Sequence, residues 1–297
     1  MSWLDLHMHS GESMDGEHSP EELVRIAKEA GVKVMAICDH NLTTGVKRGV
    51  EAAKKEGIIC IPAVELDVTC SGRNFHIIGY GIDPDHEELI AFGEKTRENK
   101  RKQGQKNMAK MREMGFFFDE EAVIKNCKQG NILPAKIIDQ ILLDPRNDGN
   151  PMLEPYRGRA TPGIDFYWEN CAKPDSPGFL AAFNISAEEG IRCIKAAGGT
   201  VVLAHPGANM GENAELFQEL VELGIEGVEA FCSYHQNHED VFYRKEAAKY
   251  GLFFTQGSDY HGKFKPHIEP GSINSGFEDS IYESLCKKLE RDENYEI

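Results

Sequence analysis

Histidine and acidic residues recur at the ends of short apolar runs in this sequence. His7 and His9 are separated by one residue, and Asp259 and His261 repeat that spacing near the other end of the chain. On a strand, residues two apart point to the same face, so each pair could offer two ligands to one metal ion. Further candidates close or interrupt other apolar runs: Asp39, His40, Glu65, His76 and His205.

The chemistry that these residue types share is metal binding. Mixed imidazole and carboxylate ligands suit zinc, manganese or iron, and a carboxylate such as Glu65 can bridge two cations. A single such pair on a strand has an ordinary explanation as a surface or hydrogen-bonded histidine. The whole set is much harder to obtain by chance, so the sequence predicts one multinuclear metal site.

The elements that must position these residues alternate between strands and helices at both ends of the chain. Strands are predicted at 2–9, 34–40, 58–68, 74–82, 200–207, 225–232 and 252–262. Helices are predicted at 19–32, 43–57, 186–199, 212–224, 238–251 and 279–291, the first with Ser19 as N-cap and Glu22 completing a capping box. The strands are nearly continuous in apolar residues, as in a sheet covered by helices. If they form a barrel of parallel strands, their C-terminal ends meet at one mouth.

The middle of the chain follows a different pattern. Residues 84–115 form a long charged helical stretch, and residues 144–178 are rich in Pro, Gly and aromatic residues, which predicts an irregular loop or lid. We therefore expect an α/β protein in which residues 1–83 and 185–297 form a barrel. Residues 84–184 would be a mainly helical inserted subdomain.

Composition restricts the partners. The formal net charge of −16 argues against binding of long nucleic acids, but bound cations would still allow a small anionic substrate. No apolar run reaches the roughly 18 residues of a membrane helix, so no membrane association is expected. The eight cysteines form no CxxC pair, and several lie in apolar runs, which favours reduced thiols and a cytoplasmic location.

Four motifs resemble, in their order along the chain, those of the PHP (polymerase and histidinol phosphatase) family. They are DLHMHSGESMDGEHSPEELVRIAKEAGVKVMAICDHN, HIIGYGID, VVLAHPG and GSDYHGKFKP. The resemblance implies a distorted, amidohydrolase-like (β/α)7 barrel with two or three divalent metal ions (Mn, Zn or Fe). It also implies a phosphoesterase in which a metal-bridged hydroxide attacks phosphorus.

The resemblance further divides the ligands among three ions. The sets are His7, His9, Glu65 and Asp259; Glu65, His76 and His205; and Asp15, His40 and His261. Asp15 stands in SMDG, where the family usually has SDG, so Met14 is an insertion beside this ligand. Asp39 would orient a ligand or a nearby water.

The substrate residues are predicted from relatives that act on small nucleotides. Such relatives carry an Arg and a His early in an insert helix, and a Lys before a Pro-Gly-aromatic segment. This chain has Pro134 where the Arg is expected and Ser176 near the position of the Lys, so the usual phosphate contacts are missing or replaced. Nearby basic residues could replace them: Lys136, Arg157, Arg159 and Lys173. His235 matches a histidine that faces the substrate, and it is a candidate general acid; otherwise it caps the following helix or faces solvent.

These residues leave several functions open. The first is hydrolysis of a nucleotide mono- or bisphosphate, and the second is hydrolysis of the cyclic phosphate of a phosphorylated sugar. An exonuclease acting on short RNA ends uses the same chemistry. A metal-binding structural module, as found attached to DNA polymerases, is the non-enzymatic alternative. The oligomeric state is not predicted.

Overall fold

The computed structural model describes residues 1–127, 131–171, 176, 178, 180 and 185–289. The chain forms two compact units. The first consists of Met1–Gly93 together with Ile185–Ile297, and the second, Glu94–Asn184, is inserted between these two parts.

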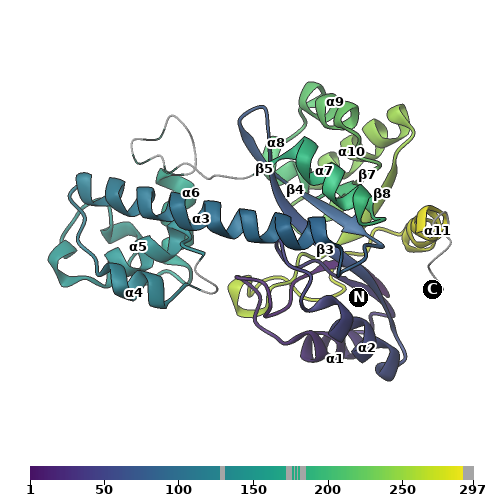
Figure 1. Cartoon of the computed structure of the whole chain (residues 1–297), viewed down its shortest axis with the longest axis horizontal. Helices are drawn as coiled ribbons and strands as arrows, with labels where there is room; N and C mark the ends of the chain where they lie inside the picture. The colour runs from purple at the N-terminus through teal and green to yellow at the C-terminus, as the bar shows by residue number, and fades with distance from the viewer. Residues whose placement is uncertain (128–130, 172–175, 177, 179, 181–184, 290–297) are drawn as a thin grey trace. The chain divides into compact units, whose positions relative to one another are not determined.

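A nearly closed sheet lies at the centre of the first unit (Figure 1). Its neighbouring strands, within the described residues, follow the order β1 (Leu4–Met8), β2 (Val34–Ile37), β3 (Ile59–Cys70), β4 (Arg73–Tyr80), β6 (Thr200–Leu203), β7 (Gly227–Cys232) and β8 (Phe253–Gly257). The short strand β5 (Ile185–Ser186) pairs with β3 outside this order. The apolar runs that predicted strands are buried, as expected for a sheet covered by helices.

Strand β4 runs antiparallel to both of its neighbours, whereas the other adjacent pairs in the sheet order are parallel. It follows β3 directly through Ser71 and Gly72, both with positive φ (48° and 72°). A hairpin here replaces the helical crossover of a regular barrel, which is one source of the distortion. Because β4 is reversed, His76 near its start pairs with Asp67 and lies at the same end of the sheet as the C-terminal ends of the parallel strands. Glu65 lies within β3, which continues to Cys70.

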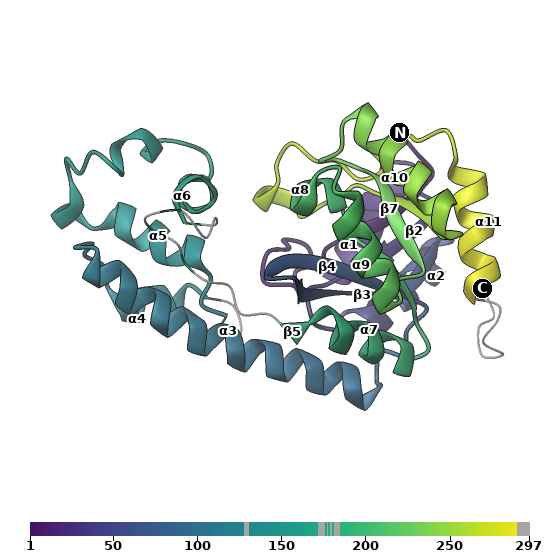
Figure 2. The same ribbon diagram turned by 90° about the horizontal axis from the view of Figure 1, so that it is seen from above.

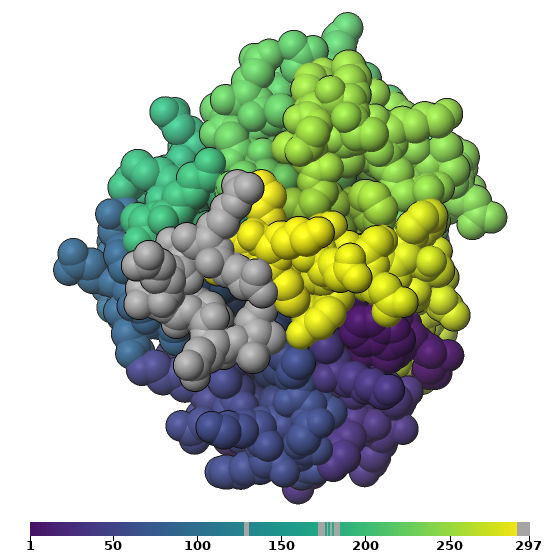
Figure 3. Space-filling view, turned by 90° about the vertical axis from the view of Figure 1, so that its right-hand side faces the viewer, coloured from purple at the N-terminus to yellow at the C-terminus, as the bar shows by residue number. Residues whose placement is uncertain are grey.

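Strands β1 and β8 come together at the end of the sheet that carries the histidines. The backbone N–H of Asp259 donates to the carbonyl of His7 at 2.8 Å, and the N–H of His9 donates to that of Tyr260 at 2.9 Å. The buried carboxylate of Asp5 accepts from the N–H groups of Ser258 and Gly271. Figure 3 shows the N-terminal segment (purple) bordering the C-terminal segment (yellow) on one face. The pairs His7/His9 and Asp259/His261 are thereby brought side by side.

Helices surround the sheet of this unit. They are α1 (Pro20–Glu29), α2 (Val46–Glu56), α7 (Ala187–Ala196), α8 (Pro206–Met210), α9 (Ala214–Leu223), α10 (Asn237–Tyr250) and α11 (Glu278–Leu289), with a 3-10 turn at η4 (Gly262–Phe264). The capping box predicted for α1 is confirmed: the Ser19 hydroxyl accepts from the Glu22 N–H, and the Glu22 carboxylate accepts from the Ser19 N–H. No helix of the described residues combines the length and apolar character needed to cross a membrane.

The second unit is helical (Figures 1 and 2). Its elements are the greater part of α3 (Glu87–Glu113), α4 (Glu120–Lys125), α5 (Pro134–Leu143), η2 (Pro145–Asn147), η3 (Glu154–Tyr156) and α6 (Pro162–Asn170). It has its own apolar core, to which Met111, Ile138 and Phe166 belong. The prediction of an irregular segment over 144–178 is wrong at α6. There Pro162 starts a helix that buries Phe166.

Candidate metal centre

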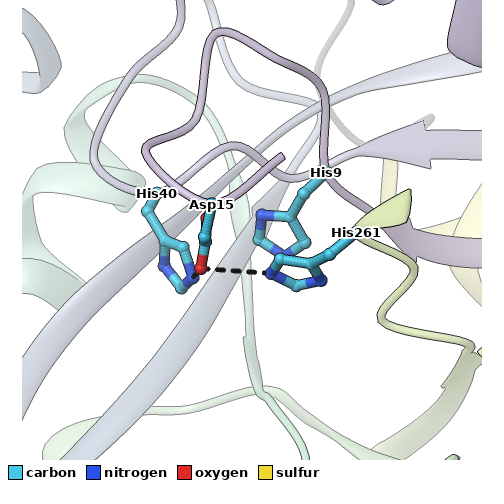
Figure 4. Close-up of side chains that lie close together, drawn as sticks. All are labelled: His9, Asp15, His40 and His261. Carbon is cyan, nitrogen blue, oxygen red and sulfur yellow. Dashed lines mark ion pairs between the residues drawn. The ribbon is translucent and has the colours of Figure 1, made fainter. Parts of the chain in front are cut away.

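Imidazole and carboxylate groups converge at the end of the sheet where β1 and β8 meet. Ligand atoms within 4.8 Å of one another form four overlapping groups: His9, Asp15, His40 and His261; His7, His9 and Asp259; His7, Glu65 and His205; and His40, Asp67 and His76. All nine ligands expected from the sequence belong to these groups, and Asp67 is an addition. Figure 4 shows the first group, drawn from the segments after β1, β2 and β8.

The spacing of the atoms around His7 and His9 matches that of ligands around one cation. Nε2 of His7 lies 3.4 Å from a carboxylate oxygen of Glu65 and 3.4 Å from one of Asp259. Nε2 of His9 lies 3.3 Å from Glu65 and 3.1 Å from Asp259. Ligands about 2.1 Å from a tetrahedral ion are about 3.4 Å apart. This group could therefore hold an ion with little rearrangement.

Glu65 presents its two oxygens to different histidines. Oε1 lies 3.1 Å from Nδ1 of His76 and 3.0 Å from Nε2 of His205. Oε2 lies 3.3 Å from Nε2 of His9 and 3.2 Å from Nδ1 of His40. A carboxylate in this position can bridge two cations.

Asp15 reaches the third group despite the insertion of Met14. One of its oxygens lies 3.4 Å from Nε2 of His40 and 3.3 Å from Nε2 of His261 (Figure 4). The Ser13 hydroxyl donates to the other oxygen at 2.7 Å. Asp15 therefore faces the two histidines with which it is expected to share an ion.

Three of the histidines are oriented so that Nε2 points into the cluster. The Nδ1–H groups donate outward, from His7 to Glu229 (3.0 Å), from His205 to Asn209 (3.1 Å) and from His261 to the carbonyl of Asp259 (2.8 Å). A hydrogen bond of this kind fixes the tautomer whose Nε2 lone pair is available to a metal.

Several buried atoms that face the cluster have no hydrogen-bond partner. They are Oε2 of Glu65, Oδ1 of Asp259 and Nε2 of His261. Burying such atoms without compensation is costly, and native proteins rarely leave them unpaired. Divalent cations held by the ligand sets to which these atoms belong would satisfy them, so the residues fit metal ions.

The electrostatics of the cluster depend on mutual pairing. Burial would raise the pKa of Glu65, but His76, His40 and His7 outweigh burial and hold it well below its usual value. Burial would likewise lower the pKa of His7, but Glu229, Glu65 and Asp259 hold it well above its usual value. In contrast, burial, with His9 and Lys265, lowers the pKa of His261 to about 4. Without metal, the cluster is therefore a set of buried carboxylates partly neutralised by protonated imidazoles.

Two proposed ligands have backbone conformations that are rare for their residue types. His205 has φ 27° and Asp259 has φ 58°. Positive φ in a non-glycine residue is strained and tends to occur at functional sites. At His205 the strained turn is held by Glu229, whose carboxylate accepts from the His205 N–H at 2.8 Å.

Two carboxylates at this site, Glu229 and Asp67, were not predicted from the sequence. Glu229 in β7 has no exposed side-chain surface and accepts from both His7 and His205. Asp67 lies 2.9 Å from Nδ1 of His40 and 3.3 Å from Nε2 of His76. Each had a signal in the sequence. Glu229 is a lone carboxylate in an apolar strand, and Asp67 is separated by one residue from Glu65, on the same face of β3.

Asp39 supports the site from outside the ligand set. Its two oxygens accept from the Ser10 N–H at 2.7 Å and from the Ser10 hydroxyl at 2.6 Å. Burial raises the pKa of Asp39, although Ser10 opposes the shift. Asp39 thus anchors the segment that follows His9.

His235 occupies a structural position. Its Nδ1–H donates to the carbonyl of Ala230 at 2.9 Å, and its Nε2 accepts from the N–H of Gly207 at 2.9 Å. The side chain has no exposed surface. Both ring nitrogens are therefore paired with backbone groups in this structure, whereas the sequence suggested His235 as a candidate general acid.

The basic residues suggested as substrate contacts in the insert are paired within the second unit. Lys136 lies 3.3 Å from Asp139. Arg157 forms ion pairs with Asp148 and Glu154 and donates to a backbone carbonyl. Arg159 lies 2.8 Å from Glu169 and stacks over the ring of Tyr156. Lys173 lies outside the described residues.

Comparison with known proteins finds a matching domain and several phosphoesterase relatives. Residues 5–130 match the PHP domain. The chain is 27% identical over 264 residues to the 3',5'-nucleoside bisphosphate phosphatase of Chromobacterium violaceum, covering 88% of each protein. It is 27% identical over 268 residues to the phosphoribosyl 1,2-cyclic phosphate 1,2-diphosphodiesterase of Eggerthella lenta, covering 89% of this chain and 97% of that protein. It is 29% identical over 263 residues to the 5'-3' exoribonuclease of Haemophilus influenzae, covering 86% of this chain and 89% of that protein.

A solved structure agrees with these matches. It is an amidohydrolase from Chromobacterium violaceum with bound sulfate and no metal. The two folds match with a TM-score of 0.74 and 25% sequence identity over 96% of both chains. We conclude that the chain carries a PHP domain and that it is a phosphoesterase, like the relatives named above.

Proposed function

We propose that the chain hydrolyses a small phosphorylated metabolite, a nucleoside mono- or bisphosphate, using two or three divalent ions of manganese, zinc or iron. The observation that carries the proposal is the buried convergence of Glu65 and Asp259 with imidazole nitrogens at 3.0–3.4 Å, with one oxygen of each carboxylate lacking a hydrogen-bond partner.

Three sets of residues would hold the ions. They are His7, His9, Glu65 and Asp259; Glu65, His76 and His205; and Asp15, His40 and His261. When bound, divalent cations activate water and neutralise charge on phosphoryl oxygens.

The protein's own groups contribute orientation. Glu229 holds the proton on Nδ1 of His7 and, through the His205 N–H, fixes the strained turn at His205. Asp67 lies beside Nδ1 of His40, whose Nε2 faces Asp15, and beside Nε2 of His76, whose Nδ1 faces Glu65. These contacts restrict ring rotation, so the ligand atoms are prearranged at the positions that catalysis needs.

The substrate class follows from the relatives and from charge. The bisphosphate phosphatase of Chromobacterium violaceum acts on a small nucleotide and aligns over 88% of each protein. The net charge of −16 disfavours the extended phosphate contacts that a long RNA needs. A small anion bound to the cations is therefore favoured over the RNA substrate of the exoribonuclease relative.

A second candidate substrate is a cyclic phosphate of a phosphorylated sugar. The diphosphodiesterase of Eggerthella lenta aligns over 97% of its own length with this chain at 27% identity, the same identity as the phosphatase. Both reactions involve attack of water on phosphorus and differ in the leaving oxygen.

The test is a screen of the manganese-loaded protein against phosphorylated metabolites, with release of phosphate as the readout. Nucleoside bisphosphates and a ribose cyclic phosphate should be assayed in parallel, the cyclic ester by chromatography of its ring-opened product. We expect hydrolysis of at least one of them to be lost in His9→Ala but kept in His267→Ala, because His9 is buried and His267 is exposed. Hydrolysis by His9→Ala at the wild-type rate would contradict the proposal.

A further inference from the structure

One lysine of the first unit reaches the candidate metal centre. Nζ of Lys265 lies 2.5 Å from Oδ2 of Asp259 and 2.5 Å from the hydroxyl oxygen of Tyr234. The Tyr234 hydroxyl also donates to Oδ2 of Asp259 at 2.5 Å. Lys265 and Tyr234 thus form a pair of donors on one side of a proposed metal ligand.

The two oxygens of Asp259 face different surroundings. Oδ1 faces the Nε2 atoms of His7 and His9 and has no hydrogen-bond partner. Oδ2 accepts from Lys265 and Tyr234. The ammonium group therefore stands beside the cluster without occupying the place of an ion.

This donor pair is accessible to solvent, whereas the ligand that it contacts is buried. The side chain of Lys265 is 31% exposed and that of Asp259 is 3% exposed. Tyr234 is 37% exposed, and its ring packs edge-on against the His205 ring with centroids 5.6 Å apart. The pair therefore borders the cluster between Asp259 and His205, where it can meet an anion that arrives from solvent.

Two other cations in the first unit pair with carboxylates outside the proposed ligand set. Lys263, two residues earlier, lies 3.3 Å from Glu17. Arg48 pairs with Glu12 and Glu21. Lys265, in contrast, forms an ion pair with Asp259, a member of the proposed ligand set.

We propose that Lys265 and Tyr234 bind a phosphoryl oxygen of the substrate. These two residues of the first unit would then supply a phosphate contact, in place of the basic residues of the second unit that are paired with carboxylates. This inference rests on the proposed function and deepens it. An ammonium group has three N–H donors, and a phenol has one O–H donor. Both can turn from Oδ2 of Asp259 to an incoming phosphoryl oxygen, since charge-assisted hydrogen bonds to phosphate are strong.

Calorimetric titration of the manganese-loaded full chain with inorganic phosphate tests the proposal without requiring turnover. We expect Lys265→Met to keep the wild-type manganese content and to weaken phosphate binding about ten- to hundredfold, as loss of a charged hydrogen bond implies. Tyr234→Phe should weaken it less, and Lys265→Arg should restore part of it. Lys263→Met is the matched control and should bind phosphate like the wild type. With an active substrate, KM should rise more than kcat falls.

Two results would overturn the proposal. One is wild-type phosphate affinity in Lys265→Met and Tyr234→Phe. The other is loss of manganese from both variants with KM unchanged in the loaded fraction, which would make Lys265 and Tyr234 positioning residues for Asp259. If the wild type binds phosphate through Lys265 but hydrolyses no ester, the proposed function fails while the phosphate contact stands.

Discussion

Nδ1 of His7 lies 3.0 Å from Oε1 of Glu229, and neither side chain has any exposed surface. This contact spans the sheet from β1 to β7 and leaves Nε2 of His7 facing Glu65 and Asp259. Since a carboxylate behind a histidine ligand fixes its tautomer and orientation, Glu229 belongs to the working site although it faces away from the proposed ions.

Replacing Glu229 by glutamine should weaken metal binding. The amide keeps the size of the side chain but can no longer accept on both sides from His7 and the His205 N–H. We expect a roughly 10- to 100-fold loss in manganese affinity or in activity. Metal titration followed by calorimetry measures it, with Glu222→Gln on the exposed face of α9 as control. Unchanged affinity would show that Glu229 serves only the fold.

Replacing Asp67 by asparagine should affect a different part of the site. Asp67 contacts His40 and His76, whereas His7 and His9 have other partners. We expect fewer ions bound per chain by elemental analysis and a roughly 10- to 100-fold lower activity. Asp85→Asn, at an exposed surface ion pair, is the control. Wild-type metal content together with wild-type activity would remove Asp67 from the site.

The His235→Ala variant should lose stability and keep its chemistry. Its ring satisfies the Gly207 N–H and the Ala230 carbonyl, and leaving such groups unpaired costs about 1–3 kcal/mol. We expect a lower Tm, with the rate per metal-loaded molecule and the pH profile unchanged. His238→Ala, at an exposed position, should change neither. A large fall in kcat at unchanged Tm would instead restore His235 as a substrate-facing acid.

The metal-free protein should lose stability as the pH rises above neutrality. Burial lowers the pKa values of His7 and His40, but nearby carboxylates raise both well above the usual 6.5. Their contribution is therefore present below about pH 6.5 and is lost as the pH rises through the raised values. Glu65 has the opposite shift, so its contribution is lost only as the pH falls below its usual 4.5.

Thermal unfolding with a chelator, from about pH 6 to about pH 9, checks this prediction. A loss of about 1 kcal/mol lowers Tm by roughly 2–4 °C for a domain of this size. With manganese bound, the decrease in Tm with rising pH should disappear, because metal binding needs neutral imidazoles and strengthens as they deprotonate. A Tm of the metal-free protein that rises over this range would contradict the charge distribution described for the cluster.

The ligands could be predicted from the sequence because their positions follow from local rules. His7 and His9 share a face of one strand, and an apolar run before His205 or Asp259 marks a strand end. These rules concern residues within one strand, so they can be applied without knowing which strands lie side by side. The (β/α)7 barrel was implied by the family resemblance, and the strand pattern did not show that β4 is reversed, although Ser71 and Gly72 form a turn-favouring pair.

The remaining features depend on tertiary contacts. Glu229 is a single carboxylate in an apolar strand, and its role appears only when β7 lies beside β6 and near β1. His235 was considered a substrate-facing residue because it matches a histidine of relatives. In the structure both of its ring nitrogens form hydrogen bonds with backbone groups of α8 and β7. The irregular composition of 144–178 concealed α6, since burial of Phe166 in the core of the second unit stabilises a helix that propensity does not predict.

Ester hydrolysis should depend on ions held by the ligand set from His7 to His261, and removal of metal by a chelator followed by reconstitution tests this dependence. The protein is stripped of metal, assayed for phosphate release from a phosphate ester that the loaded wild type hydrolyses, and assayed again after addition of manganese or zinc. We predict no hydrolysis in the stripped protein, recovery on reconstitution, and no recovery in Asp259→Asn. Full activity in the protein shown by elemental analysis to be free of metal would contradict the account.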